Sequence, residues 1–110
     1  MIRVSFFYPN TAQSGFDLDY FLQYHLRKVE EVLKPAGLVD VQVDRGIGTP
    51  DPDTPVPFSV IEHLMFNNFE EMQTAMGEHG QELMADVPNF TNVEPLVQIN
   101  RSELSNHLHL

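Results

Sequence analysis

The sequence has no cysteine and few basic residues. Without cysteine, the chain can form no disulfide, no thiolate metal site and no cysteine nucleophile. Six lysine and arginine residues stand against sixteen acidic ones, which gives a formal net charge of −10. A polyanion or an anionic membrane surface would be repelled by such a chain, because binding to either one needs a basic patch. We therefore expect no nucleic-acid partner and no membrane partner.

Long hydrophobic runs are also missing. No stretch approaches the roughly 20 apolar residues that cross a bilayer, and the first residues, MIRVSFFYPN, lack the apolar core of a signal peptide. Together with the lack of cysteine, this favours a cytoplasmic location. A length of 110 residues is enough for one domain. We place that domain at residues 1–100, with a C-terminal tail at 101–110.

The pattern of apolar residues predicts six elements in the order β-α-β-β-α-β. The expected strands are 2–9, 38–44, 58–66 and 92–100, and the expected helices are 17–33 and 67–87. Asn67 with Glu70, or Asn68 with Glu71, has the spacing that begins the second helix. This order is that of a ferredoxin-like α+β fold, a four-stranded antiparallel sheet with both helices on one face.

Two further features of this predicted fold bear on function. Gly77 and Gly80 favour a break of the second helix into two shorter ones. The segment 46–57 is rich in proline and glycine and too long for a hairpin turn, so it is a candidate lid.

The predicted sheet carries apolar residues on both faces. In the first strand, Ile2, Val4 and Phe6 point opposite to Phe7, and the third strand alternates in the same way. Because the helices can cover only one face, the other face needs a cover, and a second copy of the chain supplies one by two-fold symmetry. The sequence therefore predicts a homodimer.

His25 is a polar residue on the apolar side of the first predicted helix. At about 100° per residue, it shares that side with Leu18, Phe21, Leu22, Val29, Val32 and Leu33. Histidine gives and takes protons near neutral pH, so His25 is a candidate general acid or base. The alternative is a buried imidazole that only donates to a backbone carbonyl. Tyr20 and Tyr24 are expected on the outward side of this helix.

Two other histidines are expected to point inward. His79 is near the inner side of the second helix, and His63 shares a strand face with Met65. A cleft between helices and sheet could gather all three histidines. Asp86 could then orient one of them, or it could only cap a turn.

We predict no metal site in the domain, because a local pair such as His-x-x-x-His is missing there. His107 and His109 in the tail could bind a metal adventitiously.

The sequence resembles the EthD family, named for ethyl tert-butyl ether degradation. The resemblance is carried by MIRVSFFYP, FDLDYFLQYH, PAGL, EHLMF and HGQELMADVPNFTNVEPLVQI, in that order and spacing. It implies a dimeric α+β barrel with a ligand cleft inside each protomer. The family's histidine in the first helix corresponds to His25, that of the second helical region to His79, and the position in the third strand to His63. Leu26 and Arg27 follow His25, where many members have proline.

Relatives by fold include cofactor-independent monooxygenases, lactone isomerases, polyketide cyclases, haem-degrading enzymes and stress-response proteins, so the fold alone does not choose an activity. The first hypothesis is a dimer that binds a small, mostly apolar metabolite and performs cofactor-free acid/base chemistry such as cyclisation or isomerisation. A second is a non-catalytic metabolite-binding or accessory dimer, and a third is a cofactor-independent monooxygenase.

We expect catalytic roles for His25, His79 and Asp86 under the first hypothesis. The expected ligand contacts are Tyr8, Leu22, His63, Met65, Met76 and Phe90.

Overall fold

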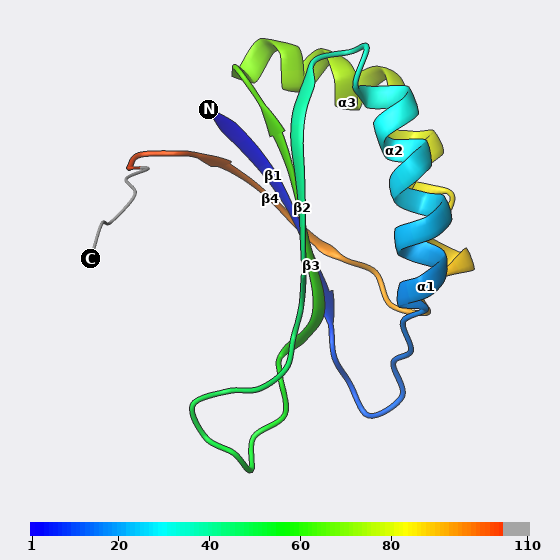
Figure 1. Cartoon of the computed structure of the whole chain (residues 1–110), viewed down its shortest axis with the longest axis vertical. Helices are drawn as coiled ribbons and strands as arrows, with labels where there is room; N and C mark the ends of the chain where they lie inside the picture. The colour runs from blue at the N-terminus through cyan, green and yellow to red at the C-terminus, as the bar shows by residue number, and fades with distance from the viewer. Residues whose placement is uncertain (105–110) are drawn as a thin grey trace.

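The computed structural model describes residues 1–104, so His107, His109 and most of the predicted tail lie outside the described residues. Within them, strands and helices follow one another in the predicted order (Figure 1). The elements are β1 (Ile2–Pro9), α1 (Leu18–Tyr20), η1 (Phe21–His25), α2 (Leu26–Leu33), β2 (Leu38–Arg45), β3 (Phe58–Phe66), α3 (Phe69–Met84), η2 (Val87–Asn89) and β4 (Leu96–Arg101). The last strand begins later than predicted, after Pro95, which has no amide hydrogen for the ladder.

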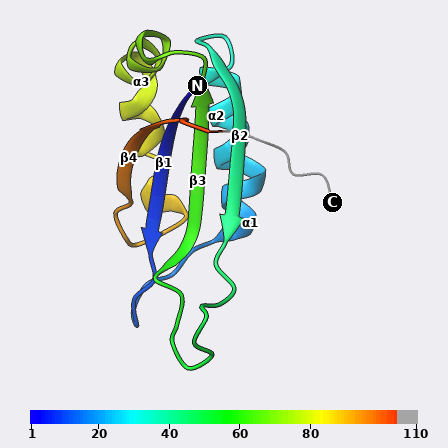
Figure 2. The same ribbon diagram turned by 90° about the vertical axis from the view of Figure 1, so that its left-hand side faces the viewer.

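The strands form one antiparallel sheet in the order β2-β3-β1-β4 (Figure 2). The two central strands, β1 and β3, pair Val4 with Leu64 and Phe6 with Glu62. Both helical stretches pack on one side of this sheet (Figure 1). The predicted ferredoxin-like α+β fold is therefore confirmed.

The core lies between the sheet and the helices. Alternate residues of the central strands face the helices and are buried, because side chains in a strand point alternately to its two faces. From β1 these are Ile2, Val4, Phe6 and Tyr8, and from β3 Val60, Glu62, Leu64 and Phe66. The helices contribute Phe21, Val29, Leu33, Met72, Ala75 and Leu83. Among these core residues, Glu62 is the one with a carboxyl group.

The first helical stretch is continuous from α1 to α2, with a wider π-helical turn, η1, in its middle. It begins at Asp17, whose side chain accepts a hydrogen bond from the amide of Tyr20 at 3.0 Å. In the π turn, the amide of Leu26 donates to the carbonyl of Phe21, five residues back. Such turns are rare and occur often at functional sites. His25 is the last residue of this turn.

The second helix, α3, is continuous, and the break predicted at Gly77 and Gly80 is wrong. The side chain of Asn68 caps the helix by accepting from the amide of Glu71 at 2.8 Å, so the second of the two predicted starts is found. Gly80 is buried against Met76, whereas Gly77 is exposed. Each glycine destabilises a helix by about 1 kcal/mol relative to alanine. Burial of the inner face of α3 stabilises the helix by more than this.

The face of the sheet turned away from the helices, here called the open face, is mixed in character. Its residues include Arg3, Ser5, Phe7, Asp40, Gln42, Asp44, Ile61, His63, Met65, Leu96, Gln98 and Asn100. The chain after β4 crosses this face in front of β1 and β3 (Figure 2). The segment 46–57 connects the end of β2 to the start of β3 and extends beyond the sheet, away from the helices (Figure 1). None of the helices within residues 1–104 has the length and apolar character needed to cross a bilayer.

Candidate functional site

A small cavity lies between the helices and the sheet. Its volume is about 20 Å³, enough for one water molecule. Three of its lining residues carry polar groups, namely Tyr8, His25 and Glu62, and the others are apolar or glycine: Phe6, Val29, Leu64, Met76, Gly80, Leu83, Met84 and Val87. No lysine or arginine is among these described lining residues. The cavity therefore encloses an imidazole and a carboxyl group in an apolar surrounding.

His25 is 3% exposed and fixed by contacts on three sides. Its ring stacks on that of Phe21 with 5.2 Å between the ring centres, and the ring centre of Phe90 lies 4.7 Å from that of His25. Its Nδ1 lies 2.8 Å from Oδ2 of Asp86. The alternative of a histidine bound only to a backbone carbonyl is therefore not found here.

Asp86 follows α3 and precedes η2, where three side chains donate to it. The hydroxyl of Tyr20 and the amide of Asn89 each donate to Oδ1 at 2.8 Å, while His25 occupies Oδ2. Partial burial alone would raise the pKa of Asp86, but the hydrogen bonds from Asn89, His25 and Tyr20 outweigh it and lower that pKa. Asp86 is therefore ionised at neutral pH.

An ionised Asp86 fixes the tautomer of His25. A carboxylate only accepts hydrogen bonds, so Nδ1 of His25 must carry the hydrogen. Desolvation lowers the pKa of His25 despite the opposing effect of Asp86. At neutral pH the ring is thus uncharged, with a lone pair on Nε2, which has no protein hydrogen-bond partner within residues 1–104. This nitrogen is available as a base.

Glu62 is the second titratable group of the cavity. It is 2% exposed, and its Oε2 is buried without a hydrogen-bond partner in the described chain. Burial raises the pKa of Glu62 to about 8. Burial, followed by the negative charge of Glu62, also raises the pKa of Tyr8. At neutral pH the carboxyl of Glu62 therefore holds its proton.

Five of the predicted site residues lie at this cavity or directly behind it. Tyr8, His25 and Met76 line it, Asp86 holds the ring of His25, and Phe90 packs against that ring. The roles expected for these residues stay predictions, but the structure brings their side chains together.

Leu22 and His79 lie elsewhere. Leu22 is 47% exposed, because the π turn rotates it away from the sheet. His79 is half-buried on α3, where Nδ1 lies 3.2 Å from Glu82 and Nε2 lies 3.7 Å from Glu78. Neither residue lines the cavity, so the structure does not bring them together with His25.

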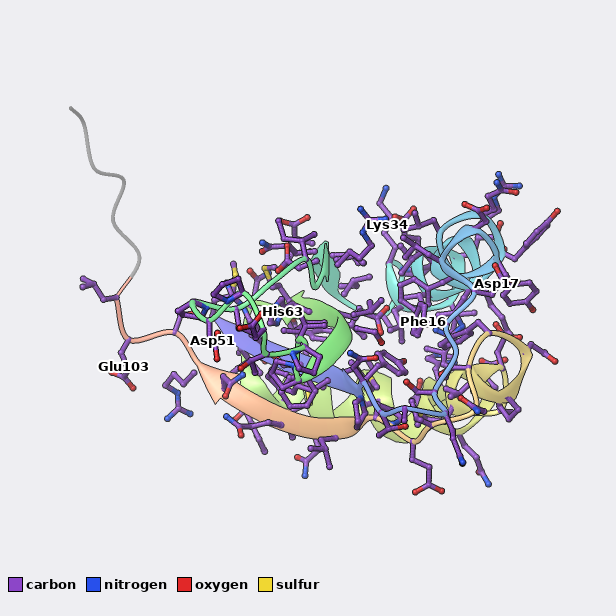
Figure 3. All side chains as sticks on the ribbon, turned by 90° about the horizontal axis from the view of Figure 1, so that it is seen from below. Phe16, Asp17, Lys34, Asp51, His63 and Glu103 are labelled. Carbon is purple, nitrogen blue, oxygen red and sulfur yellow. The ribbon has the colours of Figure 1, made fainter. Side chains whose placement is uncertain are left out.

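His63 is on the open face, opposite to the cavity (Figure 3), and Met65 is on the same face. Neither residue lines the cavity that holds His25, so the expected meeting of three histidines is not found. Strand alternation is the reason, because their neighbours Glu62 and Leu64 face the helices. Nδ1 of His63 lies 2.7 Å from the hydroxyl of Ser5, which also accepts a hydrogen bond from the amide of Asn100. His63 is therefore part of a separate polar network.

Sequence reasoning missed Glu62 and Tyr20. Glu62 occupies a position in β3 whose alternating neighbours, Val60 and Leu64, are buried, and this is the same signal that singled out His25 on its helix. Tyr20 was expected to point outward, but the π turn leaves it half-buried with its hydroxyl on Asp86. A regular helical projection does not anticipate that turn.

An apolar groove lies beside the cavity, between α3 and β4. Its volume is about 300 Å³. It is lined by Val4, Phe6, Met72, Met76, Gly80, Gln81, Met84, Val97 and Ile99. Four of these, Phe6, Met76, Gly80 and Met84, line the cavity as well. The groove and the cavity are thus neighbours separated by shared side chains.

Within residues 1–104, no group of three or more histidine and acidic residues is placed to hold a metal ion.

The 46–57 segment was a candidate lid. No residue of this segment lines the cavity, and Asp51 of this segment lies with His63 on the side away from the helices (Figure 3). This arrangement does not support a lid over the cavity.

Comparison with known proteins gives a family and a set of similar structures. The model of the EthD domain matches residues 15–94, whereas no curated protein matches the sequence. An EthD-like protein from Ralstonia eutropha JMP134 has 26% identity and a TM-score of 0.87, with 96% of this chain and 94% of that one covered.

Two more distant structures share the fold. An EthD family protein from Bacillus halodurans C-125 has 17% identity and a TM-score of 0.66, with 93% of this chain and 98% of that one covered. A dimeric ferredoxin-like protein from an uncultured marine organism has 15% identity and a TM-score of 0.52, with 96% and 100% covered.

The buried carboxyl of Glu62 predicts a pH-dependent stability. Unfolded glutamic acid ionises near pH 4.5, whereas folded Glu62 keeps its proton to about pH 8. Between these values folded Glu62 holds a proton that the unfolded residue has lost, so its contribution to the free energy of unfolding falls as pH rises, by on the order of 1 kcal/mol per pH unit. Glu62→Gln should remove this slope. Urea unfolding at fixed protein concentration from pH 4.5 to 8 measures it, and equal slopes for the two proteins would contradict the prediction.

Asp86→Asn should lower the pKa of His25 further, because the nearby negative charge that favours the imidazolium is lost. NMR titration of the His25 ring measures this pKa. The matched control is Glu82→Gln, which removes the carboxylate beside His79 and should leave the pKa of His25 unchanged. An unaltered His25 pKa in Asp86→Asn would show that Asp86 does not govern the ring.

Proposed function

This chain belongs to the EthD family, and on that premise we propose that it binds a small, mostly apolar metabolite between its helices and sheet, where His25 moves a proton. One observation carries the proposal. The apolar groove between α3 and β4 adjoins the cavity that holds His25, and the two share four lining residues. A ligand lying in the groove is therefore separated from the imidazole of His25 by these shared side chains.

The groove has the size and chemistry of a ligand site. Small-molecule pockets begin at about 300 Å³ and are mostly apolar, with a few polar groups that fix orientation. The cavity alone holds one water, so a ligand must displace Met76 and Met84 to reach His25. Methionine side chains are unbranched and adapt easily to new shapes. We expect these two side chains to form the passage between groove and cavity.

The chemistry that fits this site is acid/base catalysis without a cofactor. His25 offers an uncharged ring with Nε2 available, and Asp86 keeps it in that tautomer. Such a pair removes a proton from carbon next to a carbonyl group or delivers one to it. Enolisation, isomerisation and cyclisation of carbonyl compounds all proceed through this step.

A homodimer is the second part of the proposal. The open face exposes Leu96 beside half-buried Phe7 and Ile61, and no helix within residues 1–104 covers it. A second copy would cover these residues by two-fold symmetry. One structure with the same fold is described as a dimeric ferredoxin-like protein, which supports this arrangement.

Gly80→Leu should weaken binding of an apolar ligand about tenfold or more, because the new side chain fills the place where groove and cavity meet. Fluorescence titration with N-phenyl-1-naphthylamine, a neutral apolar dye, measures the affinity. Gly77→Leu is the matched control, since Gly77 is on the same helix with open space around it. Circular dichroism checks that both variants fold. Equal dye affinity in the two variants would place the ligand elsewhere.

Leu96→Lys should convert the dimer to monomers, because a charge would be buried within the proposed interface. Light scattering measures the mass, with twice the 12.6 kDa chain expected for the unaltered protein. Val97→Lys is the control: Val97 is 52% exposed against 60% for Leu96 but faces the helix side. A monomeric unaltered protein, or equal behaviour of both variants, would remove the open face as the interface.

A further inference from the structure

We propose that Glu62 is the acid that works with His25 and that the site takes an uncharged carbonyl compound with a hydrogen on the adjacent carbon. This inference rests on the proposed function and deepens it by naming a second reacting group and a substrate class. Glu62 comes from the sheet and His25 from the helix opposite, and both line one cavity. A ligand that reaches the cavity thus lies between them.

The unpartnered carboxyl oxygen of Glu62 needs an explanation. Buried polar groups are nearly always hydrogen-bonded, and each exception calls for an explanation, of which a catalytic role is one and a bound water is another. Here Oε2 is buried with no partner in residues 1–104. A purely structural carboxyl would be bonded to the backbone or paired with a cation, and no cation is among the described residues that line the cavity. The free oxygen is therefore available to a ligand.

The surroundings of Glu62 determine its protonation state. The titratable groups that face it from the packed elements are Tyr8 on β1 and His25 on the helix. Neither of them is positively charged at neutral pH, and an ionised carboxylate without a positive partner is very costly to bury. The raised pKa of about 8 agrees with a protonated carboxyl. Glu62 thus presents a hydrogen-bond donor where a carboxylate would present only acceptors.

These two groups select an uncharged substrate. An anionic ligand would be repelled by the nearby ionised Asp86, and it would also lose its hydration. No lysine or arginine among the described lining residues would compensate its charge. A carbonyl oxygen accepts the hydrogen bond that Glu62 offers, and the apolar groove takes the rest of the molecule. Two titratable groups whose pKa values are displaced in opposite directions are the arrangement expected of an acid and a base.

The proton transfers balance without any further reactant. Nε2 of His25 takes the proton from the carbon next to the carbonyl, and the electron pair of that C–H bond forms the double bond of an enol. The π electrons of the carbonyl move to its oxygen, which takes the proton of Glu62. The products are the enol, an imidazolium and a carboxylate. Reversal of both transfers, to the same carbon or to a conjugated one, restores the enzyme.

Exchange of carbon-bound hydrogen with solvent tests this step directly. Acetophenone is the uncharged ketone, and benzoate is an anion of similar shape. Proton NMR in D₂O follows loss of the methyl hydrogens of acetophenone, and the methyl signals of Met76 and Met84 report binding of either compound. We expect acetophenone, but not benzoate, to shift these signals, and the unaltered protein to exchange acetophenone faster than buffer does.

Variants of Glu62 separate its role from its packing. Glu62→Gln keeps a donor but cannot release a proton, and it should slow exchange about a hundredfold or more while the methionine signals still shift. Glu62→Met makes this part of the core apolar, and it serves as the second variant if the glutamine variant does not fold. It should also fail to catalyse the exchange of acetophenone hydrogens. Glu78→Gln, on the exposed side of α3, is the control and should exchange like the unaltered protein.

The outcomes distinguish this inference from the proposed function. Binding of acetophenone with unchanged exchange in Glu62→Gln would overturn Glu62 as the acid and leave His25 in place. Binding without exchange by the unaltered protein would overturn the acid/base pair and leave a binding protein. Equal binding of benzoate would overturn the uncharged substrate class. If neither compound shifts the methionine signals, the proposed binding function fails, and this inference fails with it.

Discussion

The hydrogen bond between His25 and Asp86 is the interaction on which the site depends. It joins the π turn of the first helix to the segment after α3, two parts of the chain that are far apart in sequence. It also decides which nitrogen of the ring carries hydrogen. Because Tyr20 and Asn89 donate to the same carboxylate, Asp86 is held in one orientation from three sides. The position of the imidazole is therefore fixed before any ligand enters.

Glu62, in contrast to His25, is buried without a hydrogen-bond partner for its Oε2 in the described chain. A valine or leucine at this position of β3 would extend the apolar core without any desolvation cost, as the neighbouring residues do. Retaining a carboxyl group there makes the fold less stable above the pH at which free glutamic acid ionises. Proteins carry such locally unfavourable groups mainly at functional sites. Under the proposed function, this cost is offset by the role of Glu62 toward an uncharged ligand in the adjoining apolar groove.

Much of the fold could be predicted because strand alternation and helix periodicity are local patterns. The strands at 2–9 and 58–66 were placed correctly by their alternation, and His25 was found because it interrupts an apolar stripe. The expectation that three histidines meet was wrong because alternation leaves apolar residues on both faces of β3 and does not tell which face the helices cover. In the structure they cover the face of Glu62, and His63 is on the other. The predicted break in α3 was wrong because burial of its inner face stabilises the helix more than two glycines destabilise it. Local patterns do not contain these tertiary effects.

The π turn also carries a consequence for the length of the chain. An α-helical turn holds 3.6 residues, and a π turn holds about one more. Deleting one residue from η1 would therefore convert it to a regular α-helical turn and leave the residues on either side on nearly the same faces of the helix. Inserting a residue would exceed what the turn accommodates, and the residues before the insertion would rotate by about 100° relative to those after it. This segment should therefore tolerate the loss of one residue better than the gain of one.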